Sequence, residues 1–409
     1  WSWVHSENVM SLPISEQPSK VFHHPKPRIL DAFGMAMVQH HGQVLVGAPN
    51  AGYRGRETGL AYLFDEQGQV AHTFKIPTLV PGSLFGQAVA LSERSVIVGA
   101  PHGLDELKTP HGAVYVFDRA TRKPRLTLNN PQPLTGAFGH ALAVGEKQIL
   151  VGDPQASTSA SFHSGAAFLF DETSGALLRT FRQDSAAATR STQFGHAVAM
   201  MGNRVFVSAP FGGWGDSTAG IIYLFDGQTG RLVQTYEPPN PTPSLLFGWS
   251  FAVDERVILI GAFGFQGSYR AEGMVYLFDV ESGELLNTLK NPTPTERARF
   301  GKSVALLPGL LVVGAPGDRI LETGKIKGGV VYLFDQSTGV LVTTLQESLP
   351  MTGASDIFGD ALFSDEKTLL ISAPFGGREK ELDAGVVYQY PFQAPPFSSS
   401  HPHPQKPPP

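Results

Sequence analysis

The sequence predicts an all-β protein, a seven-bladed β-propeller of four-stranded antiparallel blades. Three observations lead to this prediction. One repeat fills nearly the whole chain, each repeat holds four short strand-like segments without helical periodicity, and an orphan strand near the N-terminus matches a missing strand near the C-terminus. The repeat is marked by a Phe-Gly dipeptide at steps of 52 to 58 residues, at Phe33-Gly34, Phe85-Gly86, Phe138-Gly139, Phe194-Gly195, Phe247-Gly248, Phe300-Gly301 and Phe358-Gly359.

The first two segments of each unit are short and apolar. The first follows Phe-Gly, and its alternating Ala88 and Ala90 in the second unit suit a narrow place where neighbouring blades approach closely. The second is a run such as residues 96–98, and it ends at the Pro of a Gly-Ala-Pro element, because Pro lacks the N–H that a strand ladder needs. Both segments are therefore expected to be inner strands.

The third and fourth segments form a hairpin. The third is aromatic, as in Tyr62-Leu63-Phe64, and a Gly stands three residues before its lead aromatic in all seven copies. An Asp then opens a turn that ends on a left-handed Gly, as from Asp171 to Gly175, and the fourth strand follows. The second unit departs from this pattern, since residues 119–124 contain no Gly.

The two ends of the repeat array complement each other. The seventh unit stops after Pro391 and lacks a fourth strand, whereas residues 18–25 resemble a fourth strand without a unit. We expect this N-terminal strand to complete the last blade, so that no sheet edge stays open. The chain is thus divided into an N-terminal arm (1–17), the propeller (18–391) and a Pro-rich tail (392–409), whose composition does not favour a packed core.

The pairing of Phe-Gly with Gly-Ala-Pro over residues 18–391 resembles the FG-GAP repeat family, which includes the head propeller of integrin α chains and some fungal lectins. The resemblance implies a seven-bladed propeller found mostly outside the cytoplasm. The family's calcium loop, Asp-x-Asp-x-Asp-Gly between the first two strands, is missing, because hairpins such as Ser92-Glu93-Arg94 are too short to supply enough oxygen ligands. No metal site and no cofactor are therefore expected.

Composition excludes several classes of function. The 409 residues contain no Cys, which rules out disulfides, thiolate metal sites and a Cys nucleophile. The net charge of −5 argues against a nucleic-acid partner, and no apolar run is long enough for a transmembrane segment. No common catalytic motif occurs.

The loops between the second and third strands vary in sequence, and loops on a rigid scaffold often carry binding residues. We expect them on one face, where Trp214 in a Gly-rich loop is the strongest candidate, since an exposed Trp usually contacts something. The alternative is that these are ordinary solvated residues. The candidates on this face are Tyr53, Arg54, Trp214, Tyr269 and Arg270.

The residue after each Phe-Gly is expected at the mouth of the central channel. A ring of unlike polar groups there could hold an anion, a sugar or a metal, and the alternative is packing between blades. Two His without a neighbouring carboxylate make a weak metal site. We read the pair His40-His41 as inactive, because neighbours in a strand point to opposite faces. The ring candidates are His140, His196, Trp249, Lys302 and Asp360.

These features favour a non-enzymatic protein-binding or scaffold module. A lectin-like propeller that stacks aromatic side chains on sugars is the second hypothesis, and an enzyme centred on His140, His196 and Asp360 is the third. A secreted, cell-surface or periplasmic location, in a bacterium, is expected, since the chain begins with Trp, has no Cys and has Pro-blocked glycosylation sites.

Overall fold

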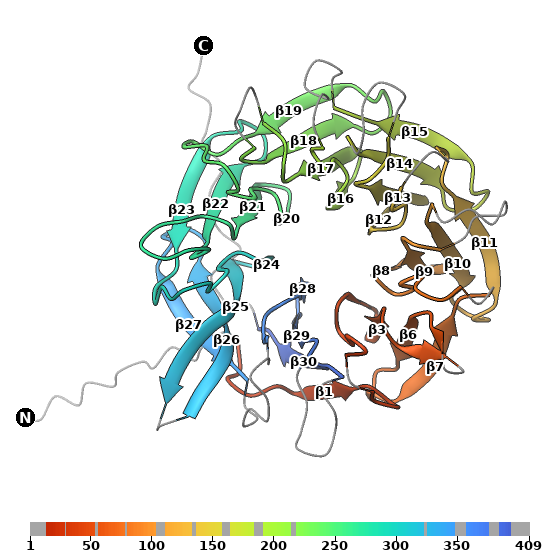
Figure 1. Ribbon diagram of the computed structural model, residues 1–409, viewed down its shortest axis with the longest axis horizontal. Coiled ribbons are helices and arrows are strands. Elements are labelled where there is room, and N and C mark those ends of the chain that lie inside the picture. The colour runs from red at the N-terminus through yellow and green to blue at the C-terminus, as the bar shows by residue number, and fades with distance from the viewer. Residues whose placement is uncertain are drawn as a thin grey trace, which may run out of the picture.

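Seven four-stranded antiparallel sheets stand around a common axis, which confirms the predicted seven-bladed propeller (Figure 1). The computed structural model describes residues 14–28, 30–53, 56–77, 80–103, 111–132, 136–157, 164–183, 191–213, 218–322, 325–347, 357–375 and 384–393. The predicted limits of the arm and the tail stay a prediction, because residues 1–13 and 394–409 lie outside the described residues.

Each blade runs from an inner strand at the axis to an outer strand at the rim, as Figure 1 shows. Blade one consists of β2 (Met37–His40), β3 (Gln43–Ala48), β6 (Leu60–Phe64) and β7 (Val70–Lys75). Blade two consists of β8 (Ala88–Leu91), β9 (Ser95–Ala100), β10 (Ala113–Asp118) and β11 (Pro124–Asn129). Blade three consists of β12 (Ala141–Gly145), β13 (Gln148–Asp153), β14 (Ala166–Asp171) and β15 (Leu177–Phe181). Blades four and five consist of β16 (Val198–Met201), β17 (Arg204–Ala209), β18 (Ile221–Asp226) and β19 (Leu232–Tyr236), and of β20 (Ser250–Val253), β21 (Val257–Ala262), β22 (Met274–Asp279) and β23 (Leu285–Lys290). Blades six and seven consist of β24 (Ser303–Leu307), β25 (Leu310–Glu322), β26 (Lys325–Asp335) and β27 (Leu341–Gln346), and of β28 (Leu362–Ser364), β29 (Thr368–Ala373), β30 (Val386–Pro391) and β1 (Lys20–His23).

The N-terminal strand closes the ring. β1 pairs antiparallel with β30, with Lys20 opposite Gln389 and His23 opposite Val386, so the first strand of the chain is the outer strand of the last blade. Ile14 also bridges Phe392, and both side chains are buried. The prediction that the chain ends interlock is confirmed.

The hydrophobic core lies between blades. Seven clusters of buried side chains fill the seven junctions, and each combines residues from two neighbouring blades. The Phe of Phe-Gly packs against the aromatic strand of its own blade; the rings of Phe300 and Tyr332, for example, are 5.6 Å apart at 64°. This edge-to-face contact adds to the burial of both rings, and it explains why aromatic residues recur at these two positions.

The Gly before the aromatic strand allows neighbouring blades to touch. A Cβ on Gly329 would lie 2.2 Å from the carbonyl oxygen of Phe358 in the next blade, and the equivalent Gly in each of the other blades meets the same oxygen at 2.0 to 2.3 Å. In the last blade this contact is made by Gly385 with Phe33 of the first blade. One repeated contact therefore runs around the ring and across its closure.

The hairpin between the third and fourth strands keeps the predicted Asp turn. Asp226 Oδ1 accepts bonds from the N–H and the hydroxyl of Thr229, which holds the pKa of Asp226 below its usual range. In blade two, Arg122 takes the left-handed position with φ 61°, although no Gly is present. The turn is therefore retained at a strained residue, whose guanidinium donates to the carbonyl of Ala71 at 2.7 Å.

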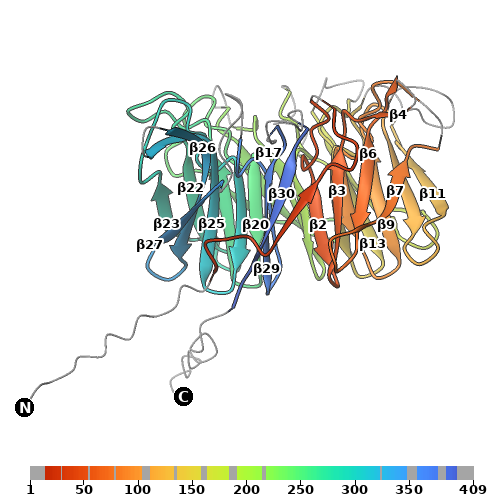
Figure 2. The same cartoon turned by 90° about the horizontal axis from the view of Figure 1, so that it is seen from below.

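The propeller has two faces. The connections between strands two and three, and between blades, emerge on the upper face, where the small hairpin of β4 (Gly52–Tyr53) and β5 (Arg56–Glu57) also lies (Figure 2). The tight hairpins between strands one and two, and three and four, form the lower face. In blade six β25 and β26 continue past a register shift after Ala315 and pair again from Arg319 opposite Gly328.

Candidate functional site

Of the predicted loop residues, Tyr269 and Arg270 in blade five are described, and both are exposed on the upper face. Trp214 and Arg54 lie outside the described residues. The backbone of Tyr53 pairs with that of Arg56 in the β4–β5 hairpin. Among the candidates for this face, Tyr269 and Arg270 are thus the two whose side chains lie in the described part of the structure.

A buried carboxylate holds the blade-five loop. Glu272 is only 8% exposed, and its Oε2 accepts bonds from the backbone N–H of Ser268 at 2.9 Å and of Tyr269 at 3.3 Å. Phe265, at the start of the loop, packs onto the core between blades four and five. The loop is therefore fixed from within and presents Tyr269, which is 44% exposed, to solvent.

The connection from blade five to blade six lies against this loop. Arg297 N donates to the carbonyl of Arg270 at 2.8 Å, and Arg299 N donates to that of Ala271 at 3.0 Å. Arg297 and Arg299 adopt left-handed backbone conformations with φ 60° and 57°. Four of the exposed side chains on these two bonded loops, one aromatic and three cationic, are called the blade-five patch: Tyr269, Arg270, Arg297 and Arg299.

Sequence reasoning found two of the four patch residues. Arg297 and Arg299 belong to a different connection from Tyr269, and only the pairing of the two loops brings them together. A signal was available, since the segment Glu296-Arg297-Ala298-Arg299 directly precedes a Phe-Gly, where the chain enters the upper face. Arg297 lies 3.9 Å from the Glu296 carboxylate, and both are more than half exposed, so this ion pair is weak.

Buried polar contacts anchor the same connection from below. Asp318 is fully buried and accepts bonds from the hydroxyl of Tyr332 at 2.7 Å and from the amide of Asn291 at 3.0 Å. Thr295 donates to the second carboxylate oxygen at 2.7 Å. Because an unpaired buried carboxylate is costly, these bonds lock residues 291–295 onto blade six.

The structure brings the ring candidates at the axis together in two groups. The ring of His196 lies 5.1 Å from that of His140 and 4.3 Å from that of Trp249. Lys302 and Asp360 form a direct ion pair between blades six and seven, with the Asp360 side chain 4% exposed. The expectation of a ring of unlike groups thus resolves into an aromatic group and an ion pair.

The aromatic group is uncharged at neutral pH. Burial lowers the pKa of His140 to about 4 and that of His196 to about 3, and each of these values is further lowered by a neighbouring histidine. Among the described residues, the carboxylate of the ring contacts Lys302 rather than either histidine. In the described part of the chain, no hydrogen bond or ion pair joins the acid of the hypothesised catalytic trio, Asp360, to His140 or His196.

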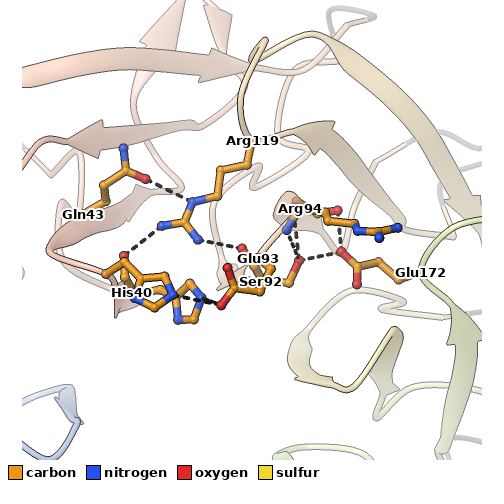
Figure 3. Close-up of polar contacts among 9 residues, drawn as sticks. His40, Gln43, Ser92, Glu93, Arg94, Arg119 and Glu172 are labelled. Atoms are coloured by element: carbon orange, nitrogen blue, oxygen red, sulfur yellow. Dashed lines mark hydrogen bonds and ion pairs between the residues drawn. The ribbon is translucent and has the colours of Figure 1, made fainter.

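On the lower face, the interpretation of His40-His41 as a pair that points to opposite faces is wrong. Nε2 of His40 and Nε2 of His41 both donate to Oε1 of Glu93, at 3.2 and 2.8 Å (Figure 3). β2 ends at His40, and His41 and Gly42 form the turn with φ 48° and 73°, a pattern typical of a type I′ turn. Strand alternation does not apply in such a turn.

Over the residues it describes, the structure contains no helix with the length and apolar character that crossing a bilayer requires.

Comparison with known proteins identifies the repeat. A model of the FG-GAP repeat matches residues 80–117, which include Phe85-Gly86, the Gly99-Ala100-Pro101 element and all but the last residue of the aromatic strand β10. No curated protein matches the chain. The matched unit is blade two, and its three elements recur in register in the other blades. Blade two therefore matches the FG-GAP repeat, and the chain as a whole resembles that family through the repetition of these elements around a seven-bladed propeller.

Proposed function

We propose that this propeller is an extracytoplasmic, non-enzymatic module that binds a protein partner through its upper face, with the blade-five patch at the centre of the contact. The observation that carries the proposal is an exposed Tyr and three exposed Arg on two loops joined by backbone hydrogen bonds. The location outside the cytoplasm rests on the resemblance to the FG-GAP family.

The composition of the patch supports protein binding. Tyr and Arg are enriched among the residues that contribute most to protein interfaces, because each combines a large contact area with hydrogen-bond donors. The loop that carries Tyr269 and Arg270 is already held in place by Glu272 and by the bonds from Arg297 and Arg299. Preorganisation of this kind lowers the entropy cost of association.

The charge of the patch indicates the kind of partner. The whole chain has a net charge of −5, yet the patch holds three arginines beside a single exposed acid, Glu296. A local positive field on an acidic protein favours a partner with an acidic surface and steers its approach. We therefore expect binding that weakens as the salt concentration rises.

Co-purification of the tagged full chain from its native source tests the proposal. Tyr269→Ala and Arg270→Ala are expected to lose a partner that the wild-type protein retains. Arg231→Ala is the matched control, because Arg231 is another exposed arginine but lies in the lower-face turn of blade four. Retention of the partner by both patch variants would contradict the proposal, as would an equal loss in Arg231→Ala.

A lectin-like function is the second candidate, and one observation favours it. Trp249 and His196 form a half-buried aromatic group at the axis, and uncharged aromatic surfaces of this kind stack on sugar rings. Binding on a glycan array that is lost in Trp249→Ala would support this function, and an array without signal would reject it.

A further inference from the structure

Two hairpins from neighbouring blades meet on the lower face, away from the proposed partner surface. The turn His41-Gly42 of blade one lies beside the turn Ser92-Glu93-Arg94 of blade two, and the inner strands β2 and β8 of the two blades pack together (Figure 3). One carboxylate oxygen of Glu93 accepts hydrogen bonds from both histidines, and the centres of the two imidazole rings are 4.2 Å apart. Two nitrogen donors and one oxygen donor thus converge from two separate blades.

One arginine fixes the backbone of both hairpins. Arg119 donates to the carbonyl of His40 at 2.9 Å and to the carbonyl of Ser92 at 2.8 Å, while its Nε donates to the side chain of Gln43 at 3.0 Å. Figure 3 shows this guanidinium between the two turns. The acceptors are neutral groups, so Arg119 acts as a structural clamp and leaves the Glu93 carboxylate to the histidines.

A second contact fixes the hairpin of Glu93 from the other side. The hydroxyls of Ser92 and Ser95 both donate to Oε1 of Glu172 in blade three, the latter at 2.6 Å. Glu172 is 5% exposed, so this anchor is buried. Both neighbours of blade two therefore constrain the turn that carries Glu93, and its side chain is presented at a defined position next to the histidines.

We propose that His40, His41 and Glu93 form a binding site for a divalent transition metal of the zinc class. Among the described residues, this is the one group of three potential ligands whose donor atoms all lie within 4.8 Å of one another. In a tetrahedral zinc site with bonds of 2.0–2.1 Å, neighbouring ligand atoms are about 3.3 Å apart. The distances of 3.2 and 2.8 Å from the histidines to Glu93 need only a small opening to meet this geometry.

The donor set selects the metal. Imidazole nitrogens suit Zn²⁺, Ni²⁺ and Cu²⁺, whereas Ca²⁺ takes six to eight oxygens. The site therefore differs from the calcium loop expected of the family, which lies within a single hairpin. Three protein ligands leave a fourth position open, and the Glu93 and His41 side chains are 72% and 67% exposed, so water or an outside ligand can reach the metal. The nearby Arg119 cation is expected to make binding weaker than that of a closed four-ligand site.

Isothermal titration of the full chain with ZnCl₂ tests this site. We expect one equivalent of Zn²⁺ to bind, and we expect His41→Asn and Glu93→Gln each to weaken binding at least about tenfold. Asn tolerates the left-handed backbone of position 41, and Gln keeps the size of Glu93 and an acceptor oxygen, so both variants should fold. The double variant His401→Ala/His403→Ala, which removes another closely spaced pair of histidines, should bind as the wild type does.

Nitrogen-15 spectra of the histidine rings provide an independent readout. Coordination is expected to shift the Nε2 signals of His40 and His41 and to leave that of His72 in β7 unchanged. The proposal is overturned if Zn²⁺, Ni²⁺ and Cu²⁺ all fail to bind the wild type. It is also overturned if His41→Asn and Glu93→Gln bind the metal as tightly as the wild type, whether or not the tail variant loses binding.

Discussion

Replacement of Gly385 by Ala is expected to open the junction where the ring closes. Gly385 has φ +107°, and an added Cβ would lie 2.1 Å from the carbonyl oxygen of Phe33 and 2.9 Å from its carbonyl carbon. Both are backbone atoms of a fully buried residue, so neither can rotate away. At the same place Phe33 N donates to the carbonyl of Ala384 at 2.9 Å. Blade one must therefore move away from blade seven.

The cost has two parts. A left-handed Ala costs about 1–2 kcal/mol in backbone strain. To relieve the clash, blades one and seven must move apart by about 1 Å at their packed junction. This movement breaks the buried hydrogen bond from Phe33 to Ala384 and adds roughly 2 kcal/mol or more to the loss of stability. Gly309→Ala is the matched control, because Gly309 has φ +79° with nothing within 4 Å of the added Cβ, so only the strain applies.

Urea unfolding, followed by tryptophan fluorescence and by circular dichroism, measures the difference. We expect Gly385→Ala to lower the free energy of unfolding by about 4 kcal/mol and Gly309→Ala by about 1–2 kcal/mol. Thermal unfolding should show a drop of roughly 5 °C for the former in a cooperative unit of this length. Equal losses for the two variants would refute the idea that this close contact holds the ring together.

Three further changes have defined outcomes. Burial lowers the pKa of His140 to about 4 and that of His196 to about 3, so both stay neutral in the folded protein down to these pH values. In the unfolded chain both take up protons near pH 6.5. The free energy of unfolding therefore falls as the pH drops from 6.5 towards 4. Urea unfolding at pH 7 and at pH 5 should show this loss of stability, up to about 2 kcal/mol per histidine. The double variant His140→Gln/His196→Gln should reduce the loss. An unchanged pH dependence in this variant would contradict the assignment of the loss to the two buried histidines. Tyr332→Phe leaves the buried Asp318 without one donor and should cost about 1–3 kcal/mol in urea unfolding, and a neutral result would show that the bond contributes nothing. Phe22→Ala empties a buried position in β1 and should cost about 3–5 kcal/mol in the same assay, whereas a loss below 1 kcal/mol would mean that β1 is not integral to blade seven.

The repeat made the fold predictable from the sequence. A Gly at the same place in every unit marks a backbone contact that admits no side chain, and a Phe-Gly at the same place marks the start of every inner strand. The closure of blade seven by β1 also followed from the sequence, because one orphan strand matched one missing strand. Repetition turns weak local signals into a strong one.

The parts that the sequence did not reveal involve single residues and contacts between different hairpins. Arg122 adopts the conformation expected of Gly, since a side-chain bond to Ala71 accompanies the strained backbone. His40 and His41 share one acceptor because a tight turn overrides strand alternation. Arg299 joins the upper-face patch only because two connections pair side by side. Such neighbours are distant in sequence and come from units whose loops do not repeat.

Site-specific photo-crosslinking tests most directly whether the upper face binds a protein partner. A photoreactive benzoylphenylalanine is placed at Tyr269 in the full chain, and for comparison at Val340, which is 64% exposed next to the lower-face turn of blade six. We predict a covalent adduct with one defined protein from position 269 and none from position 340. An adduct from position 340 alone, or equal adducts from both positions, would contradict the proposal that the blade-five patch is the docking surface.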